Sequence, residues 1–249
     1  MNKENVLKEK TLNKPSLKER LRSNIISIAG KLFHNLFGNK PSLEETAKKY
    51  SKKTGTKFIL SDQSKDKIDK FKRYGKGIII SNHPSGVFSD YLPVFASLGD
   101  EILKKSIFYT GSWNLKMNQT EFPDCTFRSA NNLGKTGLIQ LQEDIKKVNE
   151  KGGFLFIIPS GADTSENRTF KGIFKRIITN SENNLPVLSC KVKHNGKKGY
   201  LQLAKSLFTK KGGISTVNIE DKTIKDWKDK EGKPLSPKEM RAVYEGKPN

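Results

Sequence analysis

The segment Gly77-Ile78-Ile79-Ile80-Ser81-Asn82-His83-Pro84-Ser85-Gly86 carries the strongest fold signal in this chain. Its β-branched run, bounded by glycine and proline, predicts a buried strand over 77–81 that ends in a turn. Further along, a second apolar run at 154–158 predicts another strand, which ends in Pro159-Ser160-Gly161. If both strands end at the same edge of one sheet, their turns flank a cleft, which is a common place for an active site.

Strands and helices alternate through the rest of the chain. Helical patterns cover 42–51, 67–74, 86–98 with Pro93 interrupting, 138–148 before Gly152-Gly153, 170–178, and a final helix from Pro237. Further strands are predicted at 56–60, 106–109, 125–128, 186–192, 200–204 and 214–219. This alternation predicts an α/β fold with a central, mostly parallel or mixed sheet flanked by helices. We expect a basic N-terminal helical region, 1–55, followed by an α/β domain, 56–249.

The charge balance is strongly basic. The chain has 249 residues, with 47 Lys and Arg against 26 Asp and Glu, a formal net charge of +21. Residues 1–76 alone hold 20 basic against 8 acidic side chains, a surplus of 12. Such a balance favours a phosphate-rich partner, namely nucleic acid, an anionic membrane surface, a phosphorylated substrate or an acidic carrier protein. A solvated, lysine-rich face is the simpler alternative.

The stretch from Leu17 to Phe37 has apolar residues at helical spacing and basic residues between them. A basic amphipathic helix of this kind can lie in an anionic membrane interface, or its apolar stripe can pack on the protein's own core. The sequence leaves both interpretations open.

Cysteine usage and hydropathy restrict the class of protein. Cys125 and Cys190 are the only cysteines, and neither has a histidine at ligand spacing, so we expect neither a disulfide framework nor a zinc site. No run approaches about 18 apolar residues, and the N-terminus lacks an apolar signal core. We expect a cytoplasmic protein, peripheral on the inner face of a membrane.

Four segments stand in a fixed order across residues 76–192. They are Asn82-His83 with Asp90 after it, Phe127-Arg128, Ile158-Pro159-Ser160-Gly161 continued by Phe170-Lys171-Gly172, and Leu185-Pro186-Val187. This ordered set resembles the glycerolipid acyltransferase family, the lysophospholipid and glycerol-3-phosphate acyltransferases. The resemblance implies an acyltransferase-like α/β fold. It also implies transfer of a fatty acyl group from acyl-CoA or acyl carrier protein to a hydroxyl of a glycerol-phosphate or lysophospholipid acceptor. The thioester is then a co-substrate, and no metal or bound cofactor is expected.

The resemblance implies that His83 and Asp90 are catalytic. An alcohol is a poor nucleophile at neutral pH, so acyl transfer needs a base, and an imidazole is suited to that role. A carboxylate on the other ring nitrogen would fix the tautomer and stabilise the imidazolium. The family usually has its acid at the position of Phe88, whereas Asp90 comes two residues later. In a regular helix, His83 and Asp90 would be about 10 Å apart along the axis, so the pair requires irregular backbone.

The same resemblance implies an acceptor-binding set of Arg128, Ser160, Gly161 and Lys171. A planar guanidinium at Arg128 could clamp a phosphate, and Ser160-Gly161 could offer a hydroxyl and close backbone approach. The family usually carries Glu at position 160. The structural alternatives are a turn histidine capping a strand end at position 83, an ion-paired arginine, a plain turn and a solvated lysine.

We assign no function to several other motifs in the sequence. The chain has no Gly-x-Ser-x-Gly elbow, which favours direct transfer over a covalent intermediate. Gly134-Lys135-Thr136 ends like a phosphate loop, but position 129 is Ser, so we reject nucleotide binding. His34 and His194, the latter in a predicted turn, are interpreted as structural. Two rival functions remain: a non-catalytic, membrane-associated relative with a degenerate His–Asp motif, and a basic nucleic-acid-binding protein. We expect no nucleic-acid partner, because no recognised nucleic-acid motif is present.

Overall fold

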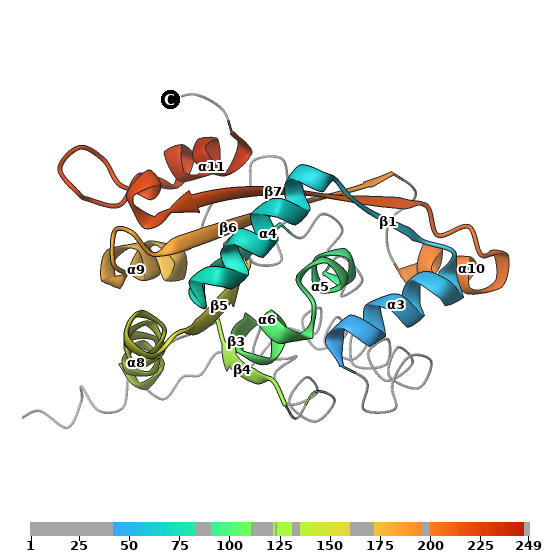
Figure 1. Ribbon diagram of the computed structural model, residues 1–249, viewed down its shortest axis with the longest axis horizontal. Helices are drawn as coiled ribbons and strands as arrows, with labels where there is room; N and C mark the ends of the chain where they lie inside the picture. The colour runs from blue at the N-terminus through green and yellow to red at the C-terminus, as the bar shows by residue number, and fades with distance from the viewer. Residues whose placement is uncertain are drawn as a thin grey trace, which may run out of the picture.

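The computed structural model describes residues 42–82, 91–110, 122, 124–130, 135–159, 172–195 and 200–246. A seven-stranded sheet runs through them in the order β1-β7-β6-β2-β5-β3-β4 (Figure 1). The strands are β1 Lys57–Leu60, β2 Lys76–Ser81, β3 Ser106–Thr110, β4 Thr126–Ser129, β5 Gly153–Ile157, β6 Pro186–Asn195 and β7 Ile214–Thr223. The pair β6–β7 is antiparallel and every other neighbouring pair is parallel. The predicted α/β fold with a mixed, mostly parallel sheet is confirmed.

Strand β2 lies at the centre of the sheet because its side chains are apolar on both faces. Ile79 packs into the hydrophobic cluster on one face, and Ile78 and Ile80 pack into the cluster on the other. All three are fully buried. Continuous β-branched runs are typical of parallel strands covered on both sides.

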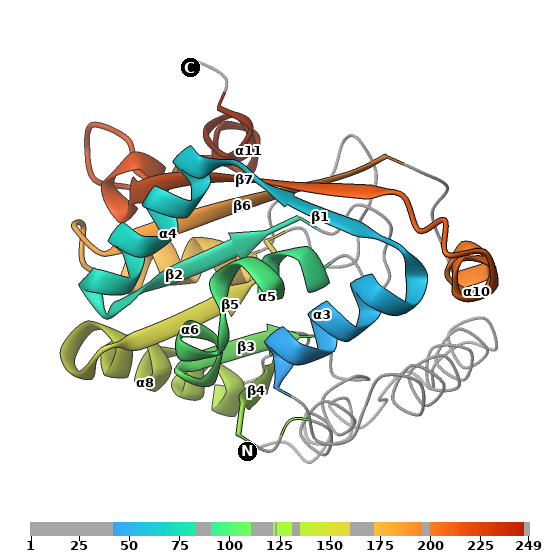
Figure 2. The ribbon, with the colours of Figure 1, turned by 45° about the vertical axis from the view of Figure 1, so that its right-hand side comes forward.

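Helices cover both faces of the sheet (Figure 2). One cluster takes its helical residues from α3 Leu43–Thr54, α4 Asp62–Tyr74, α5 Leu92–Leu98 and α6 Asp100–Lys104. The opposite cluster takes them from α8 Lys135–Lys151, α9 Gly172–Asn180, the 3₁₀ helix η3 Ile224–Trp227 and α11 Pro237–Glu245. Helix α10, Tyr200–Thr209, lies at one end of the molecule next to α3.

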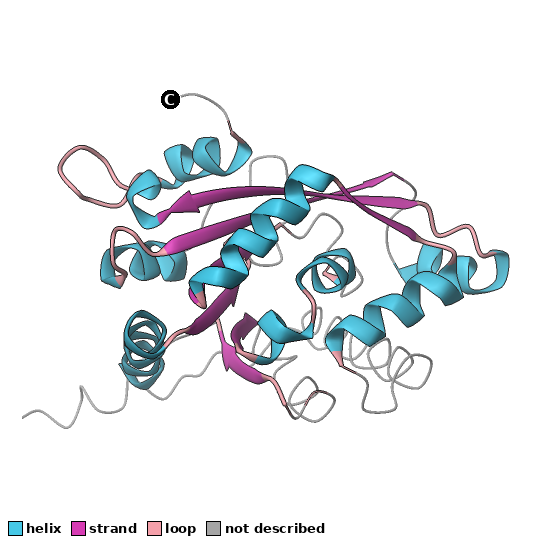
Figure 3. Ribbon diagram, in the orientation of Figure 1, coloured by secondary structure: helices cyan, strands magenta, loops and turns pink. Residues whose placement is uncertain are grey.

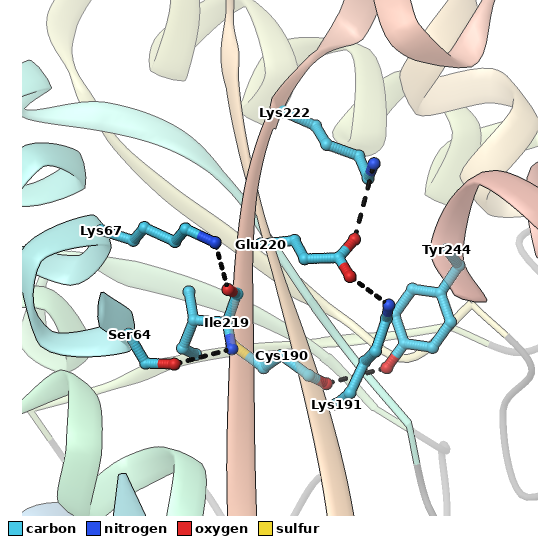
Figure 4. Close-up of polar contacts among 8 residues, drawn as sticks. All are labelled: Ser64, Lys67, Cys190, Lys191, Ile219, Glu220, Lys222 and Tyr244. Atoms are coloured by element: carbon cyan, nitrogen blue, oxygen red, sulfur yellow. Dashed lines mark hydrogen bonds and ion pairs between the residues drawn. The ribbon is translucent and has the colours of Figure 1, made fainter. Parts of the chain in front are cut away.

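Helix α4 completes the hydrogen bonding of β7 where β1 stops. Strand β1 ends opposite Val217, whereas β7 continues to Thr223. Beyond that point the N–H of Ile219 donates to Ser64 Oγ at 3.2 Å, and Lys67 Nζ donates to the Ile219 carbonyl oxygen at 3.0 Å (Figure 4). A helix that follows a short strand thereby satisfies backbone groups that an uncovered edge would expose.

Helix α11 is fixed to the other side of β6 and β7 (Figure 4). Tyr244 Oη donates to the Cys190 carbonyl oxygen at 2.8 Å, and Lys191 Nζ lies 5.8 Å from the centroid of the Tyr244 ring. Glu220 pairs with Lys191 and, at 3.5 Å, with Lys222. The predicted start of this helix is confirmed by a capping box between Ser236 and Glu239.

Two local predictions are wrong (Figure 3). Residues 200–204 belong to helix α10 and not to a strand, because the whole ten-residue segment is rich in Leu, Ala, Gln and Lys, and Leu207 packs on the core beside α3. His194 lies in β6 and not in a turn, since pairing with β7 continues to Asn195. Pro93 lies in the first turn of α5, where its missing N–H is not needed; the predicted helical residues 86–90 lie outside the described residues.

The predicted division at residue 55 stays a prediction. Helix α3, which precedes it, shares one hydrophobic cluster with the sheet through Leu43, Ala47 and Tyr50. Among the helices within the described ranges, none is both long and apolar enough to cross a bilayer.

Candidate active site

The candidate site lies at the carboxyl-terminal edge of four neighbouring parallel strands. The registers Ile80 with Ile157, Tyr109 with Ile157, and Thr110 with Ser129 show that β2, β5, β3 and β4 end together. The prediction that the first two strands end side by side at one edge is therefore confirmed. In open α/β sheets, ligands bind at this edge.

Most of the predicted site residues lie outside the described residues. These are His83, Asp90, Ser160, Gly161 and Lys171, and their roles stay predictions. The chain segments that contain the first four begin at this edge, directly after Asn82 and Pro159.

Asn82 anchors the end of β2 to β6. Its Nδ2 donates to the Val192 carbonyl oxygen at 2.9 Å, and its Oδ1 accepts from the Val192 N–H at 2.7 Å. The side-chain amide thus imitates a strand backbone and extends the β2–β6 ladder by one step. This pair of bonds fixes Asn82, the residue directly before the predicted base in the sequence.

Arg128 belongs to a buried polar cluster between the sheet and α8. Arg128 and Tyr109 are paired across β4 and β3 and so share one face of the sheet. Arg128 Nε donates to Asp144 Oδ2 at 3.2 Å, and Tyr109 Oη donates to the same oxygen at 2.8 Å. Gln140 Nε2 donates to Asp144 Oδ1 at 3.3 Å. The Asp144 side chain is 5% exposed and that of Arg128 is 35% exposed.

This cluster orients the guanidinium. Asp144 engages its Nε edge, and within the described ranges its two terminal nitrogens make no hydrogen bond. A guanidinium held along one edge can present the other to a phosphate. The ion-paired arginine considered from the sequence is present, and phosphate binding by the terminal nitrogens stays a prediction.

Sequence analysis missed Asp144, Tyr109 and the role of Asn82. A signal for Asp144 was available, because it falls in the apolar stripe of α8, between Leu141 and Val148, where a charge needs a partner. No comparable signal marks Tyr109, whose partner is 35 positions away.

The described residues show no sign of a metal centre or a reactive thiol. They contain no group of three or more His, Cys, Asp or Glu side chains that could hold a metal ion. Cys125 and Cys190 are both free thiols. Burial raises the pKa of Cys125 to about 11 and raises the pKa of Cys190 as well, which disfavours the thiolate needed for nucleophilic chemistry.

Comparison with models of known protein families gives no match, and comparison with curated proteins gives none either.

Loss of the Asn82 amide should destabilise the sheet edge. We expect Asn82→Ala to lower the free energy of unfolding by about 1–2 kcal/mol, because the Val192 N–H and C=O lose their partners. Asn82→Asp should be at least as damaging, since a carboxylate cannot donate to the Val192 carbonyl. Denaturant unfolding measures both, with Asn218→Ala, at an exposed position of β7, as the control. Equal stability of all three variants and the wild type would contradict the anchoring role.

Ionisation of Tyr109 should destabilise the protein at high pH. Burial and the hydrogen bond to Asp144 raise the pKa of Tyr109 above its ordinary value of 10.0. Above pH 10.0 the unfolded chain releases this proton and the folded chain retains it, so the free energy of unfolding falls as pH rises. One such group contributes a slope of at most about 1.4 kcal/mol per pH unit. Denaturant unfolding at several alkaline pH values should show a shallower slope for Tyr109→Phe than for the wild type. Identical slopes for Tyr109→Phe and the wild type would show that ionisation of Tyr109 does not cause the loss of stability.

Proposed function

We propose that the protein is an O-acyltransferase. It would move a fatty acyl group from acyl-CoA or acyl carrier protein to a hydroxyl of a glycerol-phosphate or lysophospholipid acceptor. The observation that carries the proposal is the shared edge of β2 and β5, which brings the segments beginning at His83 and Ser160 out of neighbouring strands. Arg128 lies near the same edge, at the end of β4.

The proposed chemistry needs one base and one thioester. His83 takes the proton of the acceptor hydroxyl while the oxygen attacks the thioester carbonyl carbon. The new C–O bond forms, the C–S bond breaks, and the proton passes from the imidazolium to the departing thiolate. Asp90 would hold the imidazole in the correct tautomer. No metal or redox group takes part in this scheme.

The acceptor phosphate would be held by Arg128, with Ser160, Gly161 and Lys171 from the segment after β5. The assignment of Arg128 is supported by Asp144, which contacts its Nε and is itself held by Tyr109 and Gln140, so the guanidinium is partly oriented before any ligand arrives. A fixed donor loses less conformational entropy on binding than a free side chain.

The charge of the chain supports the proposed partners. A net charge of +21 suits the phosphates of coenzyme A and of the acceptor, an acidic carrier protein, and an anionic lipid surface. The proposed location is the cytoplasm, peripherally on the inner face of a membrane.

A non-catalytic relative is the second candidate. The ion pair between Arg128 and Asp144 favours it, since a structural arginine would make the same contact. Its other support is the spacing of Asp90 from His83, which is two residues longer than is usual in the acyltransferase family.

Removal of the predicted base tests the proposal. Purified protein with labelled acyl-CoA and glycerol 3-phosphate or lysophosphatidate should form the acylated product. His83→Ala should reduce turnover by about a hundredfold or more with unchanged thermal unfolding. His194→Asn is the matched control, since His194 lies in β6 and contacts Ser215 at 2.8 Å, and it should retain turnover. A His83→Ala enzyme with most of its activity would rule out the catalytic assignment.

Arg128→Lys separates the two roles of the arginine. Lysine keeps a positive charge beside Asp144 but lacks the planar fork. We expect KM to rise about tenfold for glycerol 3-phosphate, with kcat changed less, and no rise for an acceptor without phosphate, such as a monoacylglycerol. Equal changes for both acceptors would identify a purely structural arginine.

A further inference from the structure

Two segments at one end of the molecule are rich in lysine and contain no acidic residue of their own; Glu44 and Glu220, just outside them, pair with Lys48 and Lys191. Residues 46–61 contain five lysines, residues 191–219 contain seven, and neither segment contains Asp, Glu or Arg. The first segment covers most of α3 and all of β1, and the second covers the end of β6, α10 and the start of β7. We call the described part of these two segments the lysine end.

Backbone contacts hold the two segments together. Lys57 is paired with Ile214 between β1 and β7, and its N–H donates to the Gly213 carbonyl oxygen at 2.9 Å. Ile214 is also paired with Asn195 of β6. At the ends of α3 and α10, a Cβ on Gly55 would lie only 1.9 Å from the Lys210 carbonyl oxygen. Both views of the ribbon place α10 at the same end of the molecule as the start of β1 (Figures 1 and 2).

Exposed apolar side chains occur among these lysines. Five large hydrophobic residues are exposed in the described part of the chain, and three of them are here: Phe208 at 89%, Ile59 at 46% and Ile214 at 39%. The exposed lysines of the lysine end include Lys52, Lys57, Lys193, Lys205, Lys210 and Lys211. An almost fully exposed aromatic ring has no folding benefit, so its position among cations points to a binding surface.

This combination suits an anionic bilayer surface. Insertion of aromatic and aliphatic side chains into the interfacial region of a bilayer is favourable, and lysines are attracted to acidic headgroups. A nucleic acid fits less well, because neither lysine-rich segment contains an arginine that could read bases, and the two exposed isoleucines offer no stacking surface. The chain's own stretch from Leu17 to Phe37 is also basic, so charge disfavours it as the occupant.

We propose that the lysine end docks on an anionic phospholipid membrane, with Phe208 entering the interface and the surrounding lysines binding headgroups. The surface adjoins the candidate active site, because Lys193 follows Val192, the residue that pairs with Asn82. Docking there would bring the carboxyl-terminal edge of β2 towards the lipid. The proposal rests on the membrane location proposed above and names the surface that would make the contact; it does not depend on acyl transfer, so vesicle binding and turnover can fail separately.

Vesicle sedimentation of the full chain tests this. The probes are phosphatidylcholine vesicles with and without phosphatidylglycerol, at low and high salt. The wild type should bind the anionic vesicles, and high salt should weaken that binding. Phe208→Ala should weaken the partition coefficient about fivefold, and Lys205→Glu with Lys211→Glu at least about tenfold. All these side chains are exposed, so thermal unfolding should not change.

Matched controls come from α8. Ile139→Ala removes an exposed hydrophobic residue, and Lys147→Glu with Lys151→Glu makes the same change of charge elsewhere. Both controls should bind anionic vesicles within about twofold of the wild type. Equal losses in the α8 and lysine-end variants would overturn the proposal, as would undiminished binding of Phe208→Ala. Tighter binding to a duplex oligonucleotide or to acyl carrier protein than to the vesicles, lost in the Lys205→Glu/Lys211→Glu variant, would also overturn it.

Discussion

The pairing of the Asn82 side chain with the Val192 backbone is the interaction on which the candidate site depends. Strand β2 is the central strand and is buried on both faces, so its position is set by packing. Packing alone does not fix the position of the residue that follows β2. The amide of Asn82 does so, because it occupies both hydrogen-bonding groups of Val192 where the regular ladder ends. The last described residue before the predicted base His83 is therefore fixed.

The second constraint is the buried carboxylate of Asp144. A buried charge must be paired, and here an arginine, a tyrosine and a glutamine share that role. The same contacts that stabilise the carboxylate hold Arg128 in one orientation. Within the described ranges the terminal nitrogens of Arg128 make no hydrogen bond, so the proposed phosphate contact is compatible with the ion pair. Structure and proposed function do not compete at this position.

The sequence predicted the parts of the fold that depend on local pattern. The β-branched run of β2, the helical stripe of α8 and the cap at Ser236 each correspond to an element of the structure. The failures have two causes, a misread local pattern and contacts between distant residues. Residues 200–204 alternate like a strand but form the first half of α10, whose composition favours a helix. His194 stays in β6 because the distant strand β7 pairs with it. The partners of Asn82 and Arg128 could not be predicted for the same reason. Asn82 and Val192 are 110 positions apart.

The most direct measurement is an experimental structure of the protein with glycerol 3-phosphate bound. The account predicts the phosphate at the carboxyl-terminal edge of β2, β5, β3 and β4, within about 3.2 Å of the terminal nitrogens of Arg128. It also predicts an acceptor hydroxyl within hydrogen-bond reach of His83 Nε2 or Nδ1. A ligand bound elsewhere, with Arg128 contacting only Asp144 and His83 turned away from the edge, would contradict the account.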